Sequence, residues 1–216
     1  MSQDATRKLI LVPAVITLAV TLLRLVGELQ GWSPLLFNKQ AGGGGALVGI
    51  AWLVPVFGAW FGWKLTRAGS GPGRIGRALG ITLLALALVP AMGFVMEKAG
   101  IDQQSLTTLG IFVVASLVAL GIGFTAWPAL GRTLVGYGLA ARVPVVIVML
   151  VAMLGNWGTH YDVPPSPDFP AMGILAKWLW IGLLPQLTIW MAFTVVIGGL
   201  FGIGAAAIAR RRPAAA

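Results

Sequence analysis

The amino-acid sequence predicts an all-α integral membrane protein, a compact bundle of six transmembrane helices with both termini in the cytoplasm. Of its 216 residues, 58% are apolar and 10% are charged, whereas an average soluble domain has about 45–50% apolar and about 25% charged residues. Six stretches are also long and apolar enough to cross about 30 Å of hydrocarbon as helices. These numbers exclude a soluble globular domain, and they exclude a disordered chain, which would be polar and highly charged.

The predicted spans leave short connections between them, so we expect one polytopic membrane domain over residues 1–216. The spans cover residues 9–29, 46–65, 78–96, 106–127, 139–158 and 178–203. The first span follows Arg7 and Lys8, as the core of a signal peptide would. Arg24 and Glu28 then take the place of a small-residue cleavage motif, and we therefore expect an uncleaved first helix.

The distribution of charge gives the predicted orientation. The net charge is +9, and most basic residues lie in the segments on one side of the predicted spans. These residues are Arg7, Lys8, Lys64, Arg67, Arg74, Arg77, Arg132, Arg142, Arg210, Arg211 and Arg212. Because basic residues collect in cytoplasmic loops, this side and the basic tail at residues 209–216 are predicted to face the cytoplasm, in a cytoplasmic (inner) membrane. The basic residues are too dilute to indicate a nucleic-acid partner.

The start of the fifth span decides where Arg142 lies. A helix that begins at Thr133 puts this arginine near the middle of the membrane, which is costly unless it has a function. A helix that begins near Leu139 lets the guanidinium reach the inner headgroups along its own stem, and residues 128–138 then lie along the interface. The second interpretation is preferred from the sequence.

Two segments predicted to lie outside are less apolar than the spans. Residues 40–46 read Q-A-G-G-G-G-A, which is either a flexible lead-in to the second helix or a re-entrant element that lines an outer vestibule. Residues 159–177 form a proline-rich loop that contains His160 and Asp162. These two side chains form either a base with its orienting carboxylate or a locally hydrogen-bonded pair. With no cysteine and one histidine in the chain, we expect no catalytic residues and no enzyme.

Arg24 and Glu28 are spaced i, i+4 near the outer end of the first span, so their side chains can pair on one helix face. One interpretation is an ion pair that snorkels to the interface. The other is an anchor for an anionic ligand or for a partner helix.

Methionine pairs with the same spacing occur in the third and fifth spans. They are Met92 with Met96 and Met149 with Met153. Their thioethers would suit Cu(I), whereas adaptable core packing is the other interpretation. No cofactor is expected, because one histidine cannot supply paired haem ligands or a usual zinc site.

Prolines lie inside three predicted spans. Pro55, Pro90 and Pro185 each remove a backbone donor and are expected to kink the helix. In one interpretation, neighbouring helices satisfy the backbone groups that these kinks leave unbonded. In the other, freed carbonyls beside Gln186 line a pathway for a small solute.

Small residues spaced four apart allow close helix packing in lipid. The pairs are Gly45–Gly49, Gly58–Gly62, Gly76–Gly80 and Gly198–Gly202. Some of these faces serve contacts inside the bundle. The surplus indicates self-association or a membrane-protein partner within the lipid bilayer.

Three functional hypotheses follow from these features. The first is a non-enzymatic membrane subunit or scaffold that packs against other membrane helices. The second is a permease or channel for a small neutral solute or a soft metal such as Cu(I), with the prolines and methionines along the route. The third is an enzyme that acts at the outer interface through His160 and Asp162.

Overall fold

A computed structural model describes residues 3–41, 45–102, 105–165 and 169–211, apart from the side chains of residues 3–5 and 211. The regular structure in this part of the chain is helical, without strands. The elements are α1 (Gln3–Leu29), α2 (Leu53–Arg67), α3 (Ile75–Lys98), α4 (Leu106–Ala126), α5 (Pro128–Gly155), α6 (Ile174–Lys177), the π-helix η2 (Trp178–Leu183), α7 (Leu184–Leu187) and α8 (Ile189–Arg211). Residues 212–216 of the predicted tail and 166–168 of the predicted outer loop lie outside the described residues.

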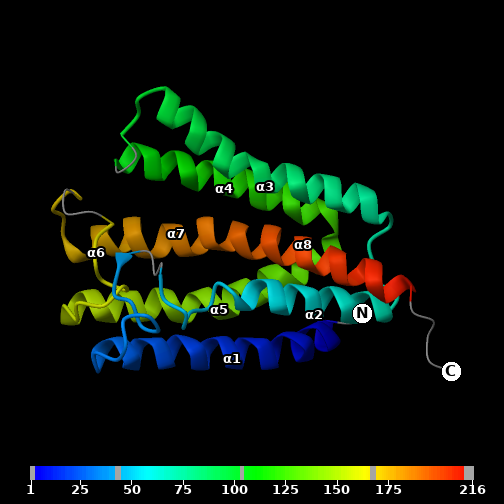
Figure 1. The fold of residues 1–216 in the computed structure, drawn as a ribbon, viewed down its shortest axis with the longest axis horizontal. Coiled ribbons are helices and arrows are strands. Elements are labelled where there is room, and N and C mark those ends of the chain that lie inside the picture. Colours follow the sequence, from blue (N-terminus) through cyan, green and yellow to red (C-terminus); the bar gives the residue numbers. More distant parts are fainter. Residues whose placement is uncertain (1–2, 42–44, 103–104, 166–168, 212–216) are drawn as a thin grey trace.

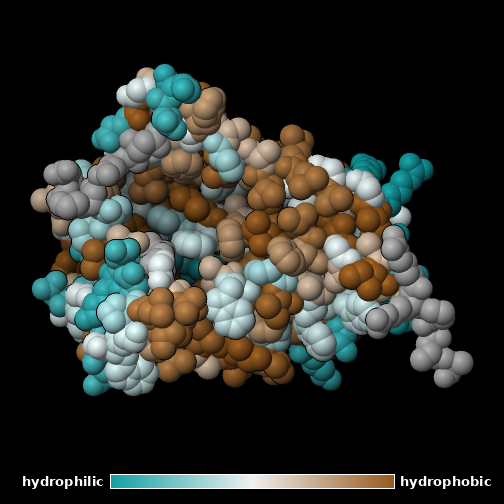
Figure 2. All heavy atoms as spheres, viewed as in Figure 1, coloured by the Kyte–Doolittle hydropathy of each residue, from teal (hydrophilic) through white to brown (hydrophobic). Residues whose placement is uncertain are grey.

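The helices lie along one common direction, and α1 begins at the end of the bundle where α8 finishes (Figure 1). Five segments are long and apolar enough to cross a membrane: Thr6–Leu29, Ile75–Lys98, Leu106–Ala126, Pro128–Gly155 and Ile174–Arg210. Large apolar side chains also cover much of the surface in Figure 2. The prediction of an all-helical, multi-pass membrane protein is therefore confirmed.

The second predicted span differs from the prediction because a helix forms only part of it and is not among the five long apolar segments. The predicted span of residues 46–65 begins with turns and bends, and α2 starts only at Leu53. Gly45 has a φ of +77°, a left-handed conformation that glycine adopts readily and that a helix cannot continue through. Pro55 lies in the first turn of α2, where its missing N–H would have no helical partner in any case. It therefore does not kink the helix as predicted.

The fifth pass is one continuous helix, so the preferred start near Leu139 is wrong. Helix α5 begins at Pro128, and proline favours the first helical position because its fixed φ suits a helix start. Arg142 is therefore in the middle of a membrane-spanning helix and is only 3% exposed. Its guanidinium contacts Gln186 and Trp190 of the last pass, so it does not reach the headgroups.

The last pass is a helix interrupted near its middle. The π-helical turn η2 follows α6, and Thr188 between α7 and α8 departs from helical dihedrals (φ −124°, ψ −72°). Pro185 cannot donate the usual helical hydrogen bond to the carbonyl of Ile181, which accounts for an irregular segment at this point. Such π-helical turns are frequent at functional sites.

Glycine pairs allow α2 and α8 to touch backbone to backbone. A Cβ atom on Gly58 would lie 2.4 Å from the carbonyl oxygen of Gly198, and one on Gly62 would lie 2.2 Å from that of Gly202. These two predicted pairs thus pack against each other inside the chain. The predicted pair at residues 45 and 49 is not on a helix, and a Cβ on Gly76 or Gly80 would meet nothing within 4 Å.

Candidate functional site: a polar cavity beside the outer loop

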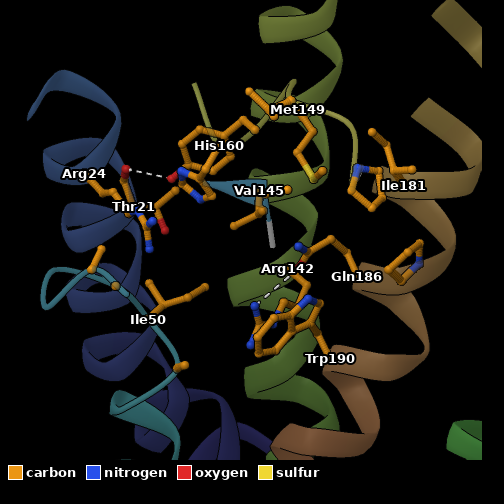
Figure 3. A pocket seen from close by; sticks show the side chains of 18 of the residues that line it. Thr21, Arg24, Ile50, Arg142, Val145, Met149, His160, Ile181, Gln186 and Trp190 are labelled. Carbon is orange, nitrogen blue, oxygen red and sulfur yellow. Dashed lines mark hydrogen bonds between the residues drawn. The ribbon is translucent and has the colours of Figure 1, made fainter. Parts of the chain in front are cut away.

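A cavity of about 770 Å³ lies in the half of the bundle that contains the loop after α5. Its walls come from α1, from residues 46–52 before α2, from α5, from the loop at residues 160–165 and from η2 through α8. Figure 3 shows Thr21 and Arg24 on α1, and shows Arg142, Gln186 and Trp190 where α5 faces the last pass.

Most of the cavity wall is apolar, with a few polar groups among the apolar side chains. The apolar side chains include those of Ile50, Trp52, Leu109, Trp180, Ile181 and Trp190, and the polar ones are those of Thr21, Arg24, Arg142, His160, Tyr161 and Gln186. A mostly apolar concavity with a few polar groups is the usual composition of a small-molecule site.

Arg142 is the central charge of the site. Its Nη1 donates a hydrogen bond of 3.3 Å to Oε1 of Gln186, and its guanidinium lies 4.8 Å from the ring centre of Trp190. Its Nε atom is buried and has no hydrogen-bond partner. Within the described residues, no carboxylate oxygen lies within 4.0 Å of this guanidinium. Arg142 is therefore held in place by neutral groups and keeps its positive charge uncompensated.

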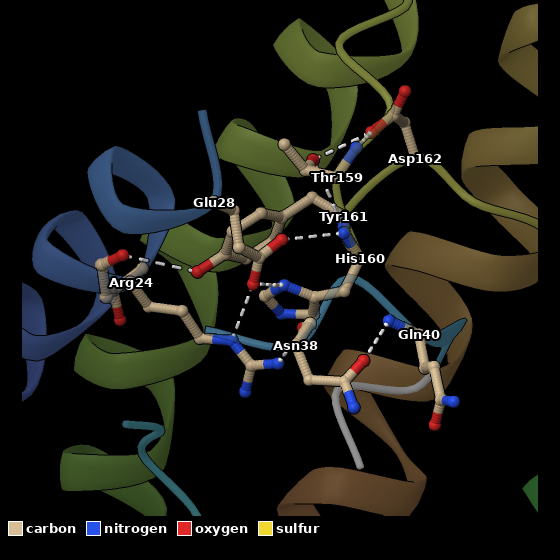
Figure 4. Close-up of polar contacts among 9 residues, drawn as sticks. Arg24, Glu28, Asn38, Gln40, Thr159, His160, Tyr161 and Asp162 are labelled. Carbon is tan, nitrogen blue, oxygen red and sulfur yellow. Dashed lines mark hydrogen bonds and ion pairs between the residues drawn. The ribbon is translucent and has the colours of Figure 1, made fainter. Parts of the chain in front are cut away.

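Glu28 is the second centre, and it joins α1 to the outer loop (Figure 4). Its Oε1 accepts a 2.8 Å hydrogen bond from Nε of Arg24 and lies 2.5 Å from Nδ1 of His160. Its Oε2 accepts a 2.8 Å hydrogen bond from the backbone N–H of His160. Glu28 is fully buried and Arg24 is 6% exposed, so this pair does not snorkel to an interface.

Arg24 extends the same network to the segment after α1. Its Nη2 donates a 2.9 Å hydrogen bond to the carbonyl oxygen of Asn38. Arg24 therefore ties residue 38 to the cluster and is neutralised by Glu28 at the same time.

The outer loop has its own internal support. The carboxylate of Asp162 accepts hydrogen bonds from the N–H of Gly158 (2.8 Å), the N–H of Thr159 (2.7 Å) and Oγ1 of Thr159 (2.7 Å). The Tyr161 hydroxyl donates a 3.2 Å bond to the carbonyl of Thr21. Asp162 therefore shapes the turn, and the predicted pair of His160 with Asp162 is replaced by His160 with Glu28.

Burial shifts the pKa values of two neighbouring loop residues, His160 and Tyr161. It lowers the pKa of His160 below its ordinary value, against the opposing effect of the hydrogen bond to Glu28. It raises the pKa of the Tyr161 hydroxyl. His160 is therefore neutral at pH 7 and donates from Nδ1 to the Glu28 carboxylate.

The structure brings some of the predicted site residues to the cavity. Arg24, Met149, His160, Pro185 and Gln186 line it. Glu28 lies directly behind Arg24 and His160.

The other predicted residues lie elsewhere. Met92 lines a separate groove between α3 and α4, and Met96 is buried. Met153 packs in a core cluster with Met149, and Pro90 is exposed on α3. The two methionine pairs are therefore not brought to one site.

Arg142 and Trp190 are the residues of the candidate site that sequence reasoning missed. A signal for Arg142 was present, because the apolar run continues on both sides of it and allowed a helix that starts well before Leu139. Gln186 and Trp190 are spaced i, i+4, a spacing that puts both on one helix face. Comparison of the chain with protein-family models, with curated proteins and with solved structures finds no match.

Proposed function

We propose that the chain is a membrane-embedded ligand-binding protein of the permease class, which takes a small solute into the cavity between α1, α5 and the interrupted last pass. The observation that carries this proposal is the cavity of about 770 Å³, a volume within the usual range of ligand sites. Polar side chains within a membrane span are costly and are usually functional. A hollow toward which several of them converge is better explained by a ligand than by structural support alone.

The irregular part of the last pass supports a solute pathway along the same wall. Ile181, Pro185 and Trp190 line the cavity from η2, α7 and α8. Backbone hydrogen bonds continue across Thr188, but the π-helical turn η2 is a feature that is frequent at functional sites. This segment is the element whose rearrangement would carry a solute between the two sides.

We also propose the orientation expected from the sequence, with the end that carries both termini in the cytoplasm. Helices α2 and α8 end at the end of the bundle where α1 begins (Figure 1), and Arg67 and Arg210 lie in their last turns. The cavity lies towards the opposite end, beside the loop after α5. Basic residues favour the cytoplasmic side. The cavity would then receive its solute from the outer side of a cytoplasmic membrane.

The other two hypotheses have less support. Gly198 and Gly202, which favoured a partner for a membrane subunit, pack against α2 of the same chain. Gly76 and Gly80 still present a small-residue face on α3 to a partner or a second copy. An enzyme built on His160 and Asp162 loses its orienting carboxylate to the outer turn. The hypothesis of a soft-metal pathway has less support because the two methionine pairs do not lie at one site.

The proposal is tested by flux in proteoliposomes. Radiolabelled glycerol, urea, acetate and octanoate are supplied to vesicles with the wild-type protein, with Val145→Trp and with Ile147→Trp. Val145 lines the cavity, whereas Ile147 lies two residues further along α5 and is 57% exposed. We expect flux of at least one solute above that of empty vesicles, lost in Val145→Trp and kept in Ile147→Trp. Flux equal to that of empty vesicles, or unchanged by Val145→Trp, would contradict the proposal.

A further inference from the structure

The cavity contains a positive charge that the protein does not neutralise. Arg142 is 3% exposed, and its Nε lacks an acceptor. A buried charge without a partner is costly in a low-dielectric environment. Gln186 and Trp190 reduce this cost without removing the charge.

The guanidinium keeps a donor that the described residues do not use. Its Nη1 contacts Gln186, and its buried Nε has no hydrogen-bond partner. Arginine binds carboxylates and phosphates through two parallel N–H donors of its guanidinium. An anion bound in this way would also satisfy the buried Nε.

The charged side chains around the cavity favour a ligand with one negative charge. Arg24 is neutralised by Glu28 at 2.8 Å, and burial lowers the pKa of His160, so this ring is neutral at pH 7. Asp162 does not line the cavity, and its carboxylate lies in the outer turn, where it accepts three hydrogen bonds. Arg142 therefore leaves the cavity with one net positive charge, which complements a monoanion better than a dianion.

The rest of the cavity wall indicates an organic molecule. The cavity of about 770 Å³ is far larger than a few-atom inorganic anion, and its walls include Leu109, Trp180 and Ile181. Apolar surface of this kind favours a hydrocarbon or aromatic body.

We propose that the cavity binds an amphipathic organic monoanion, whose carboxylate-type head pairs with Arg142 while its apolar body lies against Trp180, Trp190 and Leu109. This assignment rests on the proposed function, because it names the class of solute for the same cavity.

The test is equilibrium dialysis of labelled octanoate and labelled octanol, which share one chain and differ in charge. The protein is held in lipid nanodiscs, and empty nanodiscs give the background. The variants are Arg142→Gln, Arg142→Lys, Val145→Trp and Arg132→Gln, the last an exposed arginine on the same helix as a matched control. Unlabelled inorganic phosphate is added as a competitor in a separate arm.

We expect octanoate to bind the wild type about tenfold or more tightly than octanol, because a hydrogen bond to a charged group contributes about 1.5–3 kcal/mol. Arg142→Gln should equalise the two probes, Arg142→Lys should keep part of the preference, and Arg132→Gln should change nothing. Inorganic phosphate should not displace octanoate at equal concentration.

Three outcomes would overturn the assignment. If both probes bind the wild type equally and this binding is lost in Val145→Trp, the cavity binds ligands as proposed but has no preference for an anion, and the monoanion assignment is wrong. Binding of neither probe would remove the amphipathic monoanion as the ligand, and the flux measurement would then decide the proposed function separately. Displacement by phosphate at equal concentration would assign the site to a free inorganic anion.

A second measurement protects the test against misfolding of Arg142→Gln. The chain contains no cysteine, so Val145→Cys places a single thiol one helical turn from an intact Arg142. A negatively charged methanethiosulfonate reagent should modify this thiol faster than a positively charged one, relative to their rates with a free thiol. The reverse order would contradict the positive cavity.

Discussion

Two halves of the bundle are built on the same helices and packed in opposite ways. The half around α2 is solid: Phe57 and Phe61 each lie 5.5 Å from the ring of Tyr137, and α2 meets α8 at glycine backbones. The half around the outer loop contains the cavity and the ionisable groups. Helix α5 runs through both, with Leu130 and Leu134 in the solid half and Arg142 and Val145 on the cavity wall.

The difference arises from the segment that lies beside α5 in each half. In the solid half this neighbour is α2, a regular helix of 15 residues. In the cavity half it is the irregular segment at residues 46–52, which lines the hollow instead of filling it. A membrane bundle can therefore be stabilised in one half by close backbone contact and leave the other half free to hold polar side chains and a ligand.

The largest expected effect comes from removing the Glu28 carboxylate, which joins α1 to the outer loop. Glu28→Leu leaves Arg24 buried without its ion partner and removes two contacts of His160. Breaking a buried ion pair in this way costs about 3–5 kcal/mol. Thermal unfolding in mild detergent measures the loss.

The conservative variant Glu28→Gln is the control for this prediction. It keeps an acceptor for Arg24 and for the N–H of His160, and it should lose less stability than Glu28→Leu. Equal stability of Glu28→Leu and the wild type would show that the loop does not depend on α1.

The second effect measures how tightly the solid half is packed. Gly62→Ala places a methyl group against the backbone of Gly202, and such overpacking costs about 1–3 kcal/mol. Gly80→Ala on α3 meets nothing within 4 Å and should gain up to about 1 kcal/mol from better helix propensity. Comparable stabilities of these two variants in the same detergent would contradict the close contact of α2 with α8.

The smallest effect is a pH dependence confined to the cavity half. Burial lowers the pKa of His160, so the unfolded chain binds a proton more readily than the folded one. Stability from this group is therefore present above the unfolded pKa of about 6.5 and falls as the pH decreases below it, by at most about 1.4 kcal/mol per pH unit for one proton.

Hydrogen exchange of the outer loop at pH 7.5 and pH 5.5 measures this dependence. The charged groups around the ring are Glu28, Arg24 and Asp162. Exchange is compared as protection factors, which remove the intrinsic pH dependence of amide exchange. We expect lower protection in the loop at the lower pH, no change in protection at α2, and loss of the difference in His160→Asn. Lower protection of the loop at the higher pH would reverse the assigned protonation.

Composition and apolar runs predicted most of the fold. The third and fourth predicted spans, 78–96 and 106–127, agree closely with α3 (Ile75–Lys98) and α4 (Leu106–Ala126). These helices depend on the lipid and on local hydrophobicity, which the sequence contains. The start of α2 was not predictable in the same way, because residues 46–52 are as apolar as a span and their course depends on the cavity that they line.

The site could be predicted only in pieces, because its contacts join distant parts of the chain. His160 and Glu28 are 132 residues apart, and Arg142 and Gln186 are 44 apart. The local rule that a membrane arginine snorkels failed at Arg142 because Gln186 and Trp190 complement it inside the bundle. The i, i+4 pairing of Arg24 with Glu28 is local, and the sequence predicted it correctly.

Helix α5 faces the cavity in one half of the bundle and a packed core in the other half, and the proposed function depends on this contrast. Single cysteines at Leu130, Leu134, Val145 and Met149 test this directly, since all four side chains are less than 10% exposed and only the last two line the cavity. Each variant is treated with a water-soluble methanethiosulfonate reagent in membranes open on both sides. The account predicts modification at 145 and 149 and none at 130 and 134 on the same timescale. Equal rates at all four positions would contradict it.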